Sequence, residues 1–360
     1  MREFVFETRL PRVVFGAGAL GHLPRELASL GIARALVLST PGQRGLAERT
    51  AALLGAQCAG VFAHAAMHVP VEVARAAAAE ARRVGADGAV AIGGGSTTGL
   101  GKALALDPGL PIVAVPTTYA GSEVTSGYGL TDGGAKKTAR DPRVLPRTVV
   151  YDPELSLGLP FAITVVSMLN AIAHAAEALY APDANPVMDA IAEQGIRAGA
   201  AALDRLQREP RDVEARGDAL VAAWLCGTVL GNTTIGLHHK LCHTLGGSFD
   251  LPHAEVHAVV LPHALAHNAP ATPIAMAKIA RALAAESPAP ADPGGAPAAV
   301  FDLGRRHGAP TSLAAIGMRA EDLDRAADLA LQNPYPNPRP LERAAIRALL
   351  QRAFEGVRPG

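Results

Sequence analysis

The spacing of the apolar residues changes once along this chain, within the turn-rich segment 152–160. Before that segment, short β-type runs alternate with helical stretches such as 45–54 and 71–84. The strands expected there are 12–15, 35–38, 88–92, 111–115 and 149–151. Strands that are apolar throughout and are separated by helices are typical of a parallel sheet with both faces covered. The first part of the chain is therefore predicted to be an α/β domain.

The second part is predicted to be all-helical, because its apolar residues recur at helical spacing. The expected helices are 167–180, 187–206, 213–230, 273–285, 320–331 and 341–354. The stretch 286–297, rich in Pro, Ala and Gly, is interpreted as a loop inside this part. We thus expect two domains, an α/β domain over 1–157 and an all-helical domain over 158–360.

Charge and cysteine usage restrict the class of partner and the compartment. Lys plus Arg equals Asp plus Glu at 33 each, so no net field favours nucleic acid or an anionic membrane, and small molecules are the expected partners. The N-terminus lacks the apolar run of a secretory signal, and no membrane span is expected. Cys58, Cys226 and Cys242 are odd in number and lack metal-type spacing, which favours a reducing, cytoplasmic location.

A glycine-rich turn follows the strand that ends at residue 92. It consists of Gly93, Gly94 and Gly95, then Ser96 and Thr97, and leads into a helix. Glycines at a strand-to-helix turn let backbone N–H groups approach a phosphate, and the positive end of the helix favours the anion. An ordinary tight turn is the alternative that three glycines alone leave open.

The next strand is also followed by small polar residues, Thr117, Thr118 and Ser122. Two neighbouring strand ends with such loops form the crevice in which open α/β sheets bind dinucleotides. The two loops together therefore predict a dinucleotide site.

Seven of the twelve histidines lie between His238 and His267. His239 and His243 are four residues apart, which places both on one face of a helix, and Asn170 and His174 repeat this spacing upstream. Imidazole exchanges its proton near neutral pH and binds metals, so we interpret this region as the active site. The alternative is that a histidine serves only structure, and we apply that interpretation to three others: His22, His64 and His307.

Four motifs, in order along the chain, resemble the iron-containing (group III) alcohol dehydrogenase superfamily. They are Gly-Gly-Gly-Ser at 93–96, Pro-Thr-Thr at 116–118 with Gly-Ser-Glu-Val-Thr at 121–125, the pair Asn170 and His174, and the set His239, His243 and His253. Within the superfamily, segments 119–123, 136–147, 170–174, 238–243 and 333–340 are similar to those of maleylacetate reductases. The resemblance implies a dehydroquinate synthase-like fold with an N-terminal dinucleotide-binding domain, a C-terminal helical domain and an active site between them.

The resemblance also implies a reaction, the reduction of the conjugated double bond of the dianion maleylacetate to give 3-oxoadipate in the degradation of aromatic compounds. It assigns catalysis to His243, His239, His253 and His174, with His243 next to the nicotinamide ring. The residues expected to bind substrate are Asn170, Lys240, Tyr119, Tyr335 and Arg339. For Lys240 a solvated helix face is the alternative, and for Tyr335 and Arg339 a purely structural turn.

The expected cofactor is NADH, with NADPH tolerated, because Ser39-Thr40-Pro41 places no acidic residue after the second strand. The residues expected to bind it are Ser39, Thr40, Gly93, Gly94, Gly95, Ser96, Thr97, Thr117, Thr118, Ser122, Lys137 and His243. A homodimer is implied by the resemblance.

Metal-dependent members of the superfamily carry an aspartate where this chain has Asn170. The other three metal ligands of those members correspond to His174, His239 and His253. Because a neutral amide compensates a divalent cation poorly, no tightly bound metal is expected, with a three-histidine zinc site as the alternative. The competing functions are a metal-dependent alcohol or polyol dehydrogenase, a lyase resembling dehydroquinate synthase that uses NAD transiently, and a non-enzymatic scaffold.

Overall fold

The computed structural model describes residues 4–133, 135–284, 295–332 and 335–360, which form two compact units. The N-terminal unit consists of Thr8–Leu159 together with Arg211–Leu220. The C-terminal unit consists of Pro160–Pro210 and Val221–Gly360, with the start of the chain up to Glu7. The chain enters the N-terminal unit at Thr8 and leaves it after Leu159, close to the boundary expected at 157/158. The return of Arg211–Leu220 is a feature that the sequence pattern does not predict.

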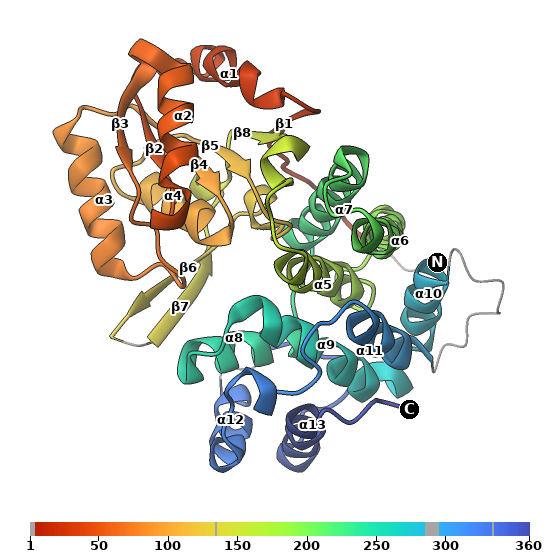
Figure 1. Cartoon of the computed structure of the whole chain (residues 1–360). Helices are drawn as coiled ribbons and strands as arrows, with labels where there is room; N and C mark the ends of the chain where they lie inside the picture. The colour runs from red at the N-terminus through yellow and green to blue at the C-terminus, as the bar shows by residue number, and fades with distance from the viewer. Residues whose placement is uncertain (1–3, 134, 285–294, 333–334) are drawn as a thin grey trace. The chain divides into compact units, whose positions relative to one another are not determined.

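A six-stranded parallel sheet organises the N-terminal unit, with strand order β1-β8-β5-β4-β2-β3 (Figure 1). Its strands are β1 (Arg12–Phe15), β2 (Ala35–Leu38), β3 (Cys58–Phe62), β4 (Gly88–Gly93), β5 (Ile112–Pro116) and β8 (Thr148–Tyr151). The predicted α/β class with a parallel sheet is confirmed. Strand β3 was not expected; it lies at the sheet edge, and its residues are only half-buried.

Alternating side chains of the strands bury both faces of this sheet. Four helices cover the sheet, α1 (Leu23–Ser29), α2 (Arg44–Leu54), α3 (Val71–Arg83) and α4 (Gly95–Leu106). Val37 of β2 packs in a cluster with residues of α1 and α2, whereas Leu36 and Leu38 pack in a cluster with residues of α3 and α4. Coverage on both faces explains why β2, β4 and β5 are apolar at nearly every position.

A separate antiparallel hairpin, β6 (Gly127–Asp132) with β7 (Ala135–Arg140), follows β5. The buried ammonium of Lys102 in α4 donates to the carbonyl oxygens of Ser122 and Gly127, at 2.7 and 2.6 Å, so it anchors the segment that leads into the hairpin. Burial lowers the pKa of Lys102 to about 7.

The C-terminal unit is helical, as predicted. Its helices are α5 (Phe161–Ala178), α6 (Pro186–Arg208), α7 (Val213–Asn232), α8 (Leu237–Phe249), α9 (His253–Asn268), α10 (Pro273–Leu283), α11 (Ala296–Arg306), α12 (Leu323–Ala330) and α13 (Arg343–Glu355). The first turns of α7 belong to the N-terminal unit. Helix α5 packs against α6 and α9, and α8 also packs against α9.

The loop expected over 286–297 is partly wrong. Residues 285–294 lie outside the described residues, but Ala296 and Pro297 form the first turn of α11. Proline is compatible with a helix start because the first N–H groups of a helix have no intrahelical acceptor.

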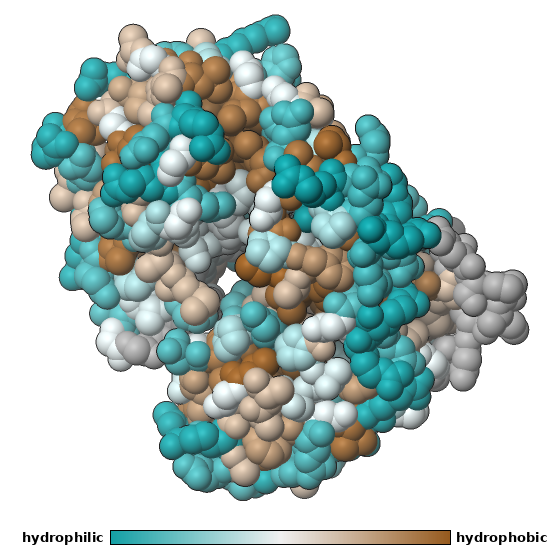
Figure 2. Space-filling model, in the orientation of Figure 1, coloured by the Kyte–Doolittle hydropathy of each residue, from teal (hydrophilic) through white to brown (hydrophobic). Residues whose placement is uncertain are grey.

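Helix α5 is long and apolar enough to cross a membrane, but 83% of its apolar window is buried inside the protein. It is therefore the core helix of its unit. The face drawn in Figure 2 shows mainly teal and white residues over the C-terminal helices, with brown residues in small groups.

Candidate active site

Three neighbouring strands of the sheet end at the predicted dinucleotide crevice. β2, β4 and β5 are adjacent and parallel, so their carboxyl ends share one edge. The Thr117 N–H donates to the Gly93 carbonyl at 3.0 Å, and the Gln43 side chain donates to Thr117 Oγ1 at 2.8 Å. The structure thus brings together the loops after β4 and β5, and it adds Gln43, which the sequence interpretation missed.

The turn into α4 needs glycine at two positions. Gly93 has a φ of +152°, and a Cβ there would lie 2.5 Å from Thr97 Oγ1. At Gly94 a Cβ would lie 3.1 Å from the Thr118 side chain. The chain therefore passes this point in close contact with its neighbours, and the N-terminus of α4 begins directly afterwards at Gly95. This is the geometry in which free helix N–H groups bind an anion.

The remaining predicted cofactor residues differ in accessibility. Gly95 and Lys137 are exposed, Thr40, Ser96 and Thr118 are half-buried, and Ser39 is fully buried. Ser39 uses its hydroxyl on the Thr40 carbonyl, so it shapes the loop after β2. Among the described atoms, the buried hydroxyls of Thr97 and Ser122 have no hydrogen-bond partner.

A cluster of imidazoles, hereafter the histidine cluster, is built from α5, α8 and α9 in the C-terminal unit. His174 stacks on His239, with ring centroids 5.2 Å apart, and His243 lies one turn further along α8, 6.2 Å from His239. His257 lies in the middle, with centroids 6.1, 5.2 and 4.6 Å from His174, His239 and His253. The structure thus brings together all four histidines predicted to be catalytic, through a fifth that was not predicted.

The histidine-rich region 238–267 is only partly active site, which corrects the interpretation of the region as a whole. His263 and His267 lie further along α9, where the neighbouring charges are Arg352 and Arg339 respectively. His307, interpreted as structural, packs edge-on against Phe161.

Glu177 is the most informative residue that the sequence interpretation missed. It lies on α5 three residues after His174 and is 2% exposed. One carboxylate oxygen accepts the backbone N–H of His238 at 2.7 Å, and the other lies 2.5 Å from His239 Nδ1. Its sequence signal was present, because 170, 174 and 177 fall on one face of an otherwise apolar helix.

Burial sets the electrostatics of this cluster. Desolvation, reinforced by the neighbouring rings, lowers the pKa of His174, His238 and His257 well below the ordinary value. Burial also acts to raise the pKa of Glu177, but His239 and the N–H groups of Gly236 and His238 outweigh it, so the net shift is downward. Burial therefore disfavours the charged form of these three rings, beside one carboxylate.

Several donor atoms in the cluster are suited to a ligand. Asn170 Oδ1, His174 Nδ1 and His239 Nε2 are buried and have no hydrogen-bond partner within the described part of the chain. These atoms fit a divalent ion, and Glu177 on His239 is the kind of outer carboxylate that supports a metal-bound imidazole. The expectation of no tightly bound metal is therefore not supported by the structure.

A second group brings one cysteine together with two histidines, although the cysteines lack metal-type spacing in the sequence. Cys242, His238 and His257 are all buried, and their ligand atoms lie within 4.8 Å of one another. His238 Nε2 and His257 Nδ1 are 2.9 Å apart, which is a hydrogen bond between the two rings. Tertiary packing of α8 on α9 creates this group, so spacing in the sequence could not reveal it.

The five predicted substrate-binding residues lie in four different places. Asn170 lies on α5, one turn before His174 of the histidine cluster. Lys240 Nζ lies 5.8 Å from the ring centroid of Tyr335, so these two are neighbours, whereas Arg339 donates to the His267 carbonyl at 3.1 Å. Tyr119 is fully buried in the N-terminal unit, where its hydroxyl accepts from Arg216 at 3.0 Å. The expectation that Tyr119 binds substrate is therefore corrected, because its hydroxyl is part of a core network.

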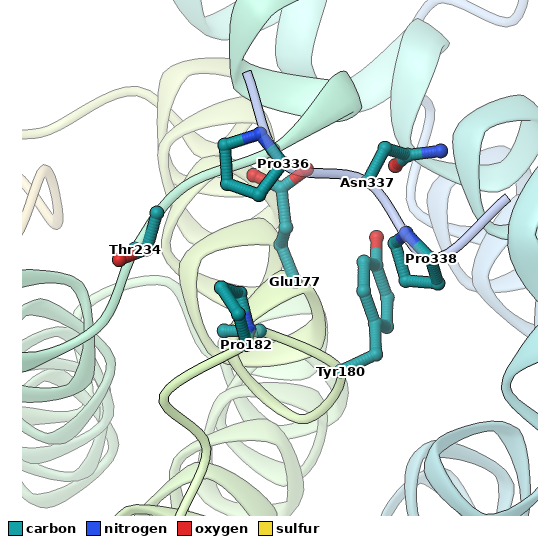
Figure 3. A pocket seen from close by; sticks show the side chains of 9 residues that line it. Glu177, Tyr180, Pro182, Thr234, Pro336, Asn337 and Pro338 are labelled. Atoms are coloured by element: carbon teal, nitrogen blue, oxygen red, sulfur yellow. The ribbon is translucent and has the colours of Figure 1, made fainter. Parts of the chain in front are cut away.

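The segment after Tyr335 closes a small cavity of about 240 Å³ beside Glu177 (Figure 3). Its lining residues are Glu177, Tyr180, Ala181, Pro182, Thr234, Gly236, Pro336, Asn337 and Pro338. The side-chain amides of Asn337 and Asn268 pair reciprocally at 2.9 and 3.0 Å and hold this segment to the end of α9. A carboxylate in the wall makes this cavity unsuitable for a dianionic substrate.

Two family profiles match the chain. One, described as "Iron-containing alcohol dehydrogenase", matches residues 11–153, and one, described as "Fe-containing alcohol dehydrogenase family, C-terminal", matches residues 164–354. The chain belongs to the iron-containing alcohol dehydrogenase family. The fold expected from the resemblance is thereby confirmed.

Relatives within this family support the narrower resemblance as well. A Burkholderia cepacia protein named maleylacetate reductase is 64% identical to this chain and covers 100% of both. The crystal structure of maleylacetate reductase from Rhizobium sp. strain MTP-10005 is 54% identical, with a TM-score of 0.92 and 100% of both chains covered. An iron-containing alcohol dehydrogenase from Corynebacterium glutamicum is 38% identical, with a TM-score of 0.92, over 100% of this chain and 99% of that one.

Proposed function

We propose that this chain is a maleylacetate reductase, an oxidoreductase that transfers a hydride from NADH or NADPH to the conjugated double bond of maleylacetate. The observation that carries the proposal is the histidine cluster, in which five imidazoles converge. Asn170 lies one turn before His174 on α5, and the resemblance to metal-dependent dehydrogenases implies an acid at its position. Full-length relatives of that name support the same assignment.

The reaction requires two tasks of the protein. Hydride leaves the nicotinamide and bonds to the alkene carbon β to the ketone, and the π electrons move onto the ketone oxygen to give an enolate. A proton must then bond to the carbon α to the ketone, which yields 3-oxoadipate and the oxidised nicotinamide. Hydrogen-bond donors that stabilise the enolate lower the barrier, and imidazole can also deliver the proton.

We assign these tasks to the histidine cluster. His239, His174 and His253 donate to the enolate oxygen and supply the proton, and His243 contacts the nicotinamide ring. Lys240, next to Tyr335, is the cation of this region suited to a substrate carboxylate, since it is half-buried and ordinarily charged. The expectation that Arg339 also binds a carboxylate is retained, because its exposed guanidinium uses only part of its donor set on His267.

If a divalent ion binds, Asn170, His174, His239 and His253 are the residues that would hold it. Such an ion would act as a Lewis acid toward the ketone oxygen. We nevertheless expect turnover without a tightly bound metal, because the amide of Asn170 is neutral and the set of ligands contains no anion to compensate a divalent cation.

The finer properties are part of the same proposal. The loops after β2, β4 and β5 bind the dinucleotide, with NADH preferred and NADPH tolerated, and Lys137 contacts its phosphates. The protein works as a cytoplasmic homodimer in the degradation of aromatic compounds.

The test is to follow NADH absorbance on addition of maleylacetate to protein treated exhaustively with EDTA. We expect one NADH oxidised per maleylacetate consumed, at the rate of untreated protein. Oxidation of primary alcohols or diols with NAD⁺, dependent on added Fe²⁺ or Zn²⁺ and without maleylacetate turnover, would instead identify a metal-dependent alcohol dehydrogenase.

A further inference from the structure

Glu177 presents a buried carboxylate to the first turn of α8. Its two oxygens have different partners, since one accepts the His238 N–H at 2.7 Å and the other lies 2.5 Å from His239 Nδ1. The helix N-terminus is the positive end of the helix dipole, and it compensates part of the negative charge. The carboxylate is thus held in place by the backbone of α8 while it contacts a side chain of the same helix.

This contact determines which nitrogen of His239 is available. A carboxylate beside Nδ1 keeps a proton on that nitrogen, since the carboxylate can only accept. The other ring nitrogen, Nε2, lies on the opposite edge of the ring from Glu177. It is buried and has no hydrogen-bond partner among the described residues, in the cluster where His174 stacks on the same ring.

The local backbone leaves little room for another arrangement. A Cβ at Gly236, the residue before α8, would lie 3.1 Å from the Pro336 carbonyl oxygen and 3.3 Å from Glu177 Oε1. Pro336 and Glu177 both line the same cavity (Figure 3). The turn that precedes α8 therefore lies close to the carboxylate, which limits its movement on that side.

We propose that Glu177 is a positioning residue, which holds a proton on Nδ1 of His239 and fixes the ring so that Nε2 faces the substrate and carries the proton that the ring delivers. The inference rests on the proposed function, because His239 must act in the reductase reaction for its orientation to matter there. Orientation of an imidazole by a buried carboxylate on its other nitrogen is a general device of catalytic histidines. The alternative role for Glu177 is to anchor α8 alone, through the His238 N–H.

A double-mutant cycle separates these two roles. Glu177→Gln keeps the size of the side chain but replaces one acceptor oxygen by a donor, which no longer suits a protonated Nδ1. We expect Glu177→Gln to lower kcat at least about tenfold, while KM and the affinity for NADH change little. In the background of His239→Ala the same substitution should have no further effect on kcat, because there is no ring left to orient.

Asp183→Asn is the matched control. Asp183 accepts the N–H and hydroxyl of Thr234 at 2.9 and 2.7 Å, so it anchors the loop before α8 without contacting a histidine of the cluster. Its effect on kcat, if any, should be multiplicative with that of His239→Ala. Multiplicative effects of Glu177→Gln and His239→Ala on kcat would overturn the positioning role.

A second measurement does not depend on turnover. In ¹⁵N-labelled protein, the Nδ1 proton of His239, assigned through its loss in His239→Ala, should resonate far downfield, and Glu177→Gln should shift or remove it. An unchanged resonance would overturn the inference even if the enzyme is active. If wild-type protein does not reduce maleylacetate but the resonance behaves as expected, the proposed function fails while the contact between Glu177 and His239 is retained as the orienting element of another reaction.

Discussion

Asn170 carries a neutral amide one turn before His174 on α5, and this neutrality has measurable consequences. Asn170→Asp should raise the content of bound Zn²⁺ or Fe²⁺ and slow the reduction of maleylacetate. A new carboxylate about 4 Å from an anionic substrate costs about 1 to 4 kcal/mol, which is roughly 5- to 10³-fold in rate. Metal content by mass spectrometry and the steady-state rate of NADH oxidation give the two readouts. Asn170→Ala, which adds no charge, is the control and should gain no metal.

His263 gives a prediction about pH and stability that is separate from catalysis. Its side chain is buried in α9, both ring nitrogens have no hydrogen-bond partner among the residues described, and burial together with Arg352 lowers its pKa to about 4. Because the unfolded value is about 6.5, the folded state resists protonation between these two values. The contribution of His263 to stability is therefore complete above about pH 6.5 and is lost as the pH falls toward 4.

Replacing this imidazole by an apolar ring of similar size should remove that dependence. When the pH is lowered from 7.5 to 5, wild type should lose about 2 kcal/mol more of its free energy of unfolding than His263→Phe loses. This follows from about 1.4 kcal/mol per pH unit below the unfolded pKa. Urea denaturation at the two pH values measures this difference. His22→Gln, at an exposed position, is the control. Equal pH dependence in His263→Phe and wild type would contradict the prediction.

The sequence indicated which histidines lie close together better than it indicated their partners. The spacing of His239 and His243 correctly indicated one helix face, since it depends only on helix geometry. His257 and Glu177 were missed because their roles depend on how α9 and α5 pack against α8, and no spacing within one helix reports that packing. Tyr119 was misassigned for the same reason, since Arg216, its partner, is distant in the sequence.

The turn between β4 and α4 is the element that we expect to bind the dinucleotide phosphates. Ser96 lies half-buried in the first turn of α4, where free backbone N–H groups attract an anion. Ser96→Glu should abolish detectable NADH binding, because its carboxylate repels the pyrophosphate. Ser96→Gln adds similar bulk without charge and should bind NADH more tightly than Ser96→Glu does. Fluorescence titration with NADH measures both affinities, and circular dichroism checks that each variant folds. An unchanged dissociation constant in Ser96→Glu would remove this turn from the cofactor site.

Elements that are buried at every position were predicted well. Elements whose sequences mix apolar residues with polar residues or proline were not. β2, β4 and β5 are buried at every position, so their apolar runs were visible in the sequence. Helix α9 was missed because Pro262 and several histidines interrupt its pattern, and it nevertheless continues through Pro262. The hairpin of β6 and β7 was missed because neither strand is an apolar run, so its residues carry little of the signal that burial produces.

At the scale of the whole molecule, neither unit is one continuous stretch of chain. The N-terminal unit includes Arg211–Leu220, and Arg216 from this segment is fully buried there. Its guanidinium donates to the Tyr119 hydroxyl at 3.0 Å and to the Leu159 carbonyl at 2.9 Å. Hydrogen bonds from a buried charged group contribute about 1.5 to 3 kcal/mol each, so this segment is part of the core of the unit. A single cut near residue 158 cannot describe such an arrangement.

The connectivity of the N-terminal unit also determines when it can be completed during synthesis on the ribosome. Strand β1 emerges first, but the strand it pairs with, β8, ends only at Tyr151. The hydrogen bond between Arg216 and Tyr119 forms later still, after Arg216 has been added and has left the exit tunnel. Contacts between such distant positions form slowly. The nascent chain therefore carries an unfinished nucleotide-binding unit while most of α5 and α6 is being made, and chaperones that bind incomplete sheets have their main opportunity in this interval.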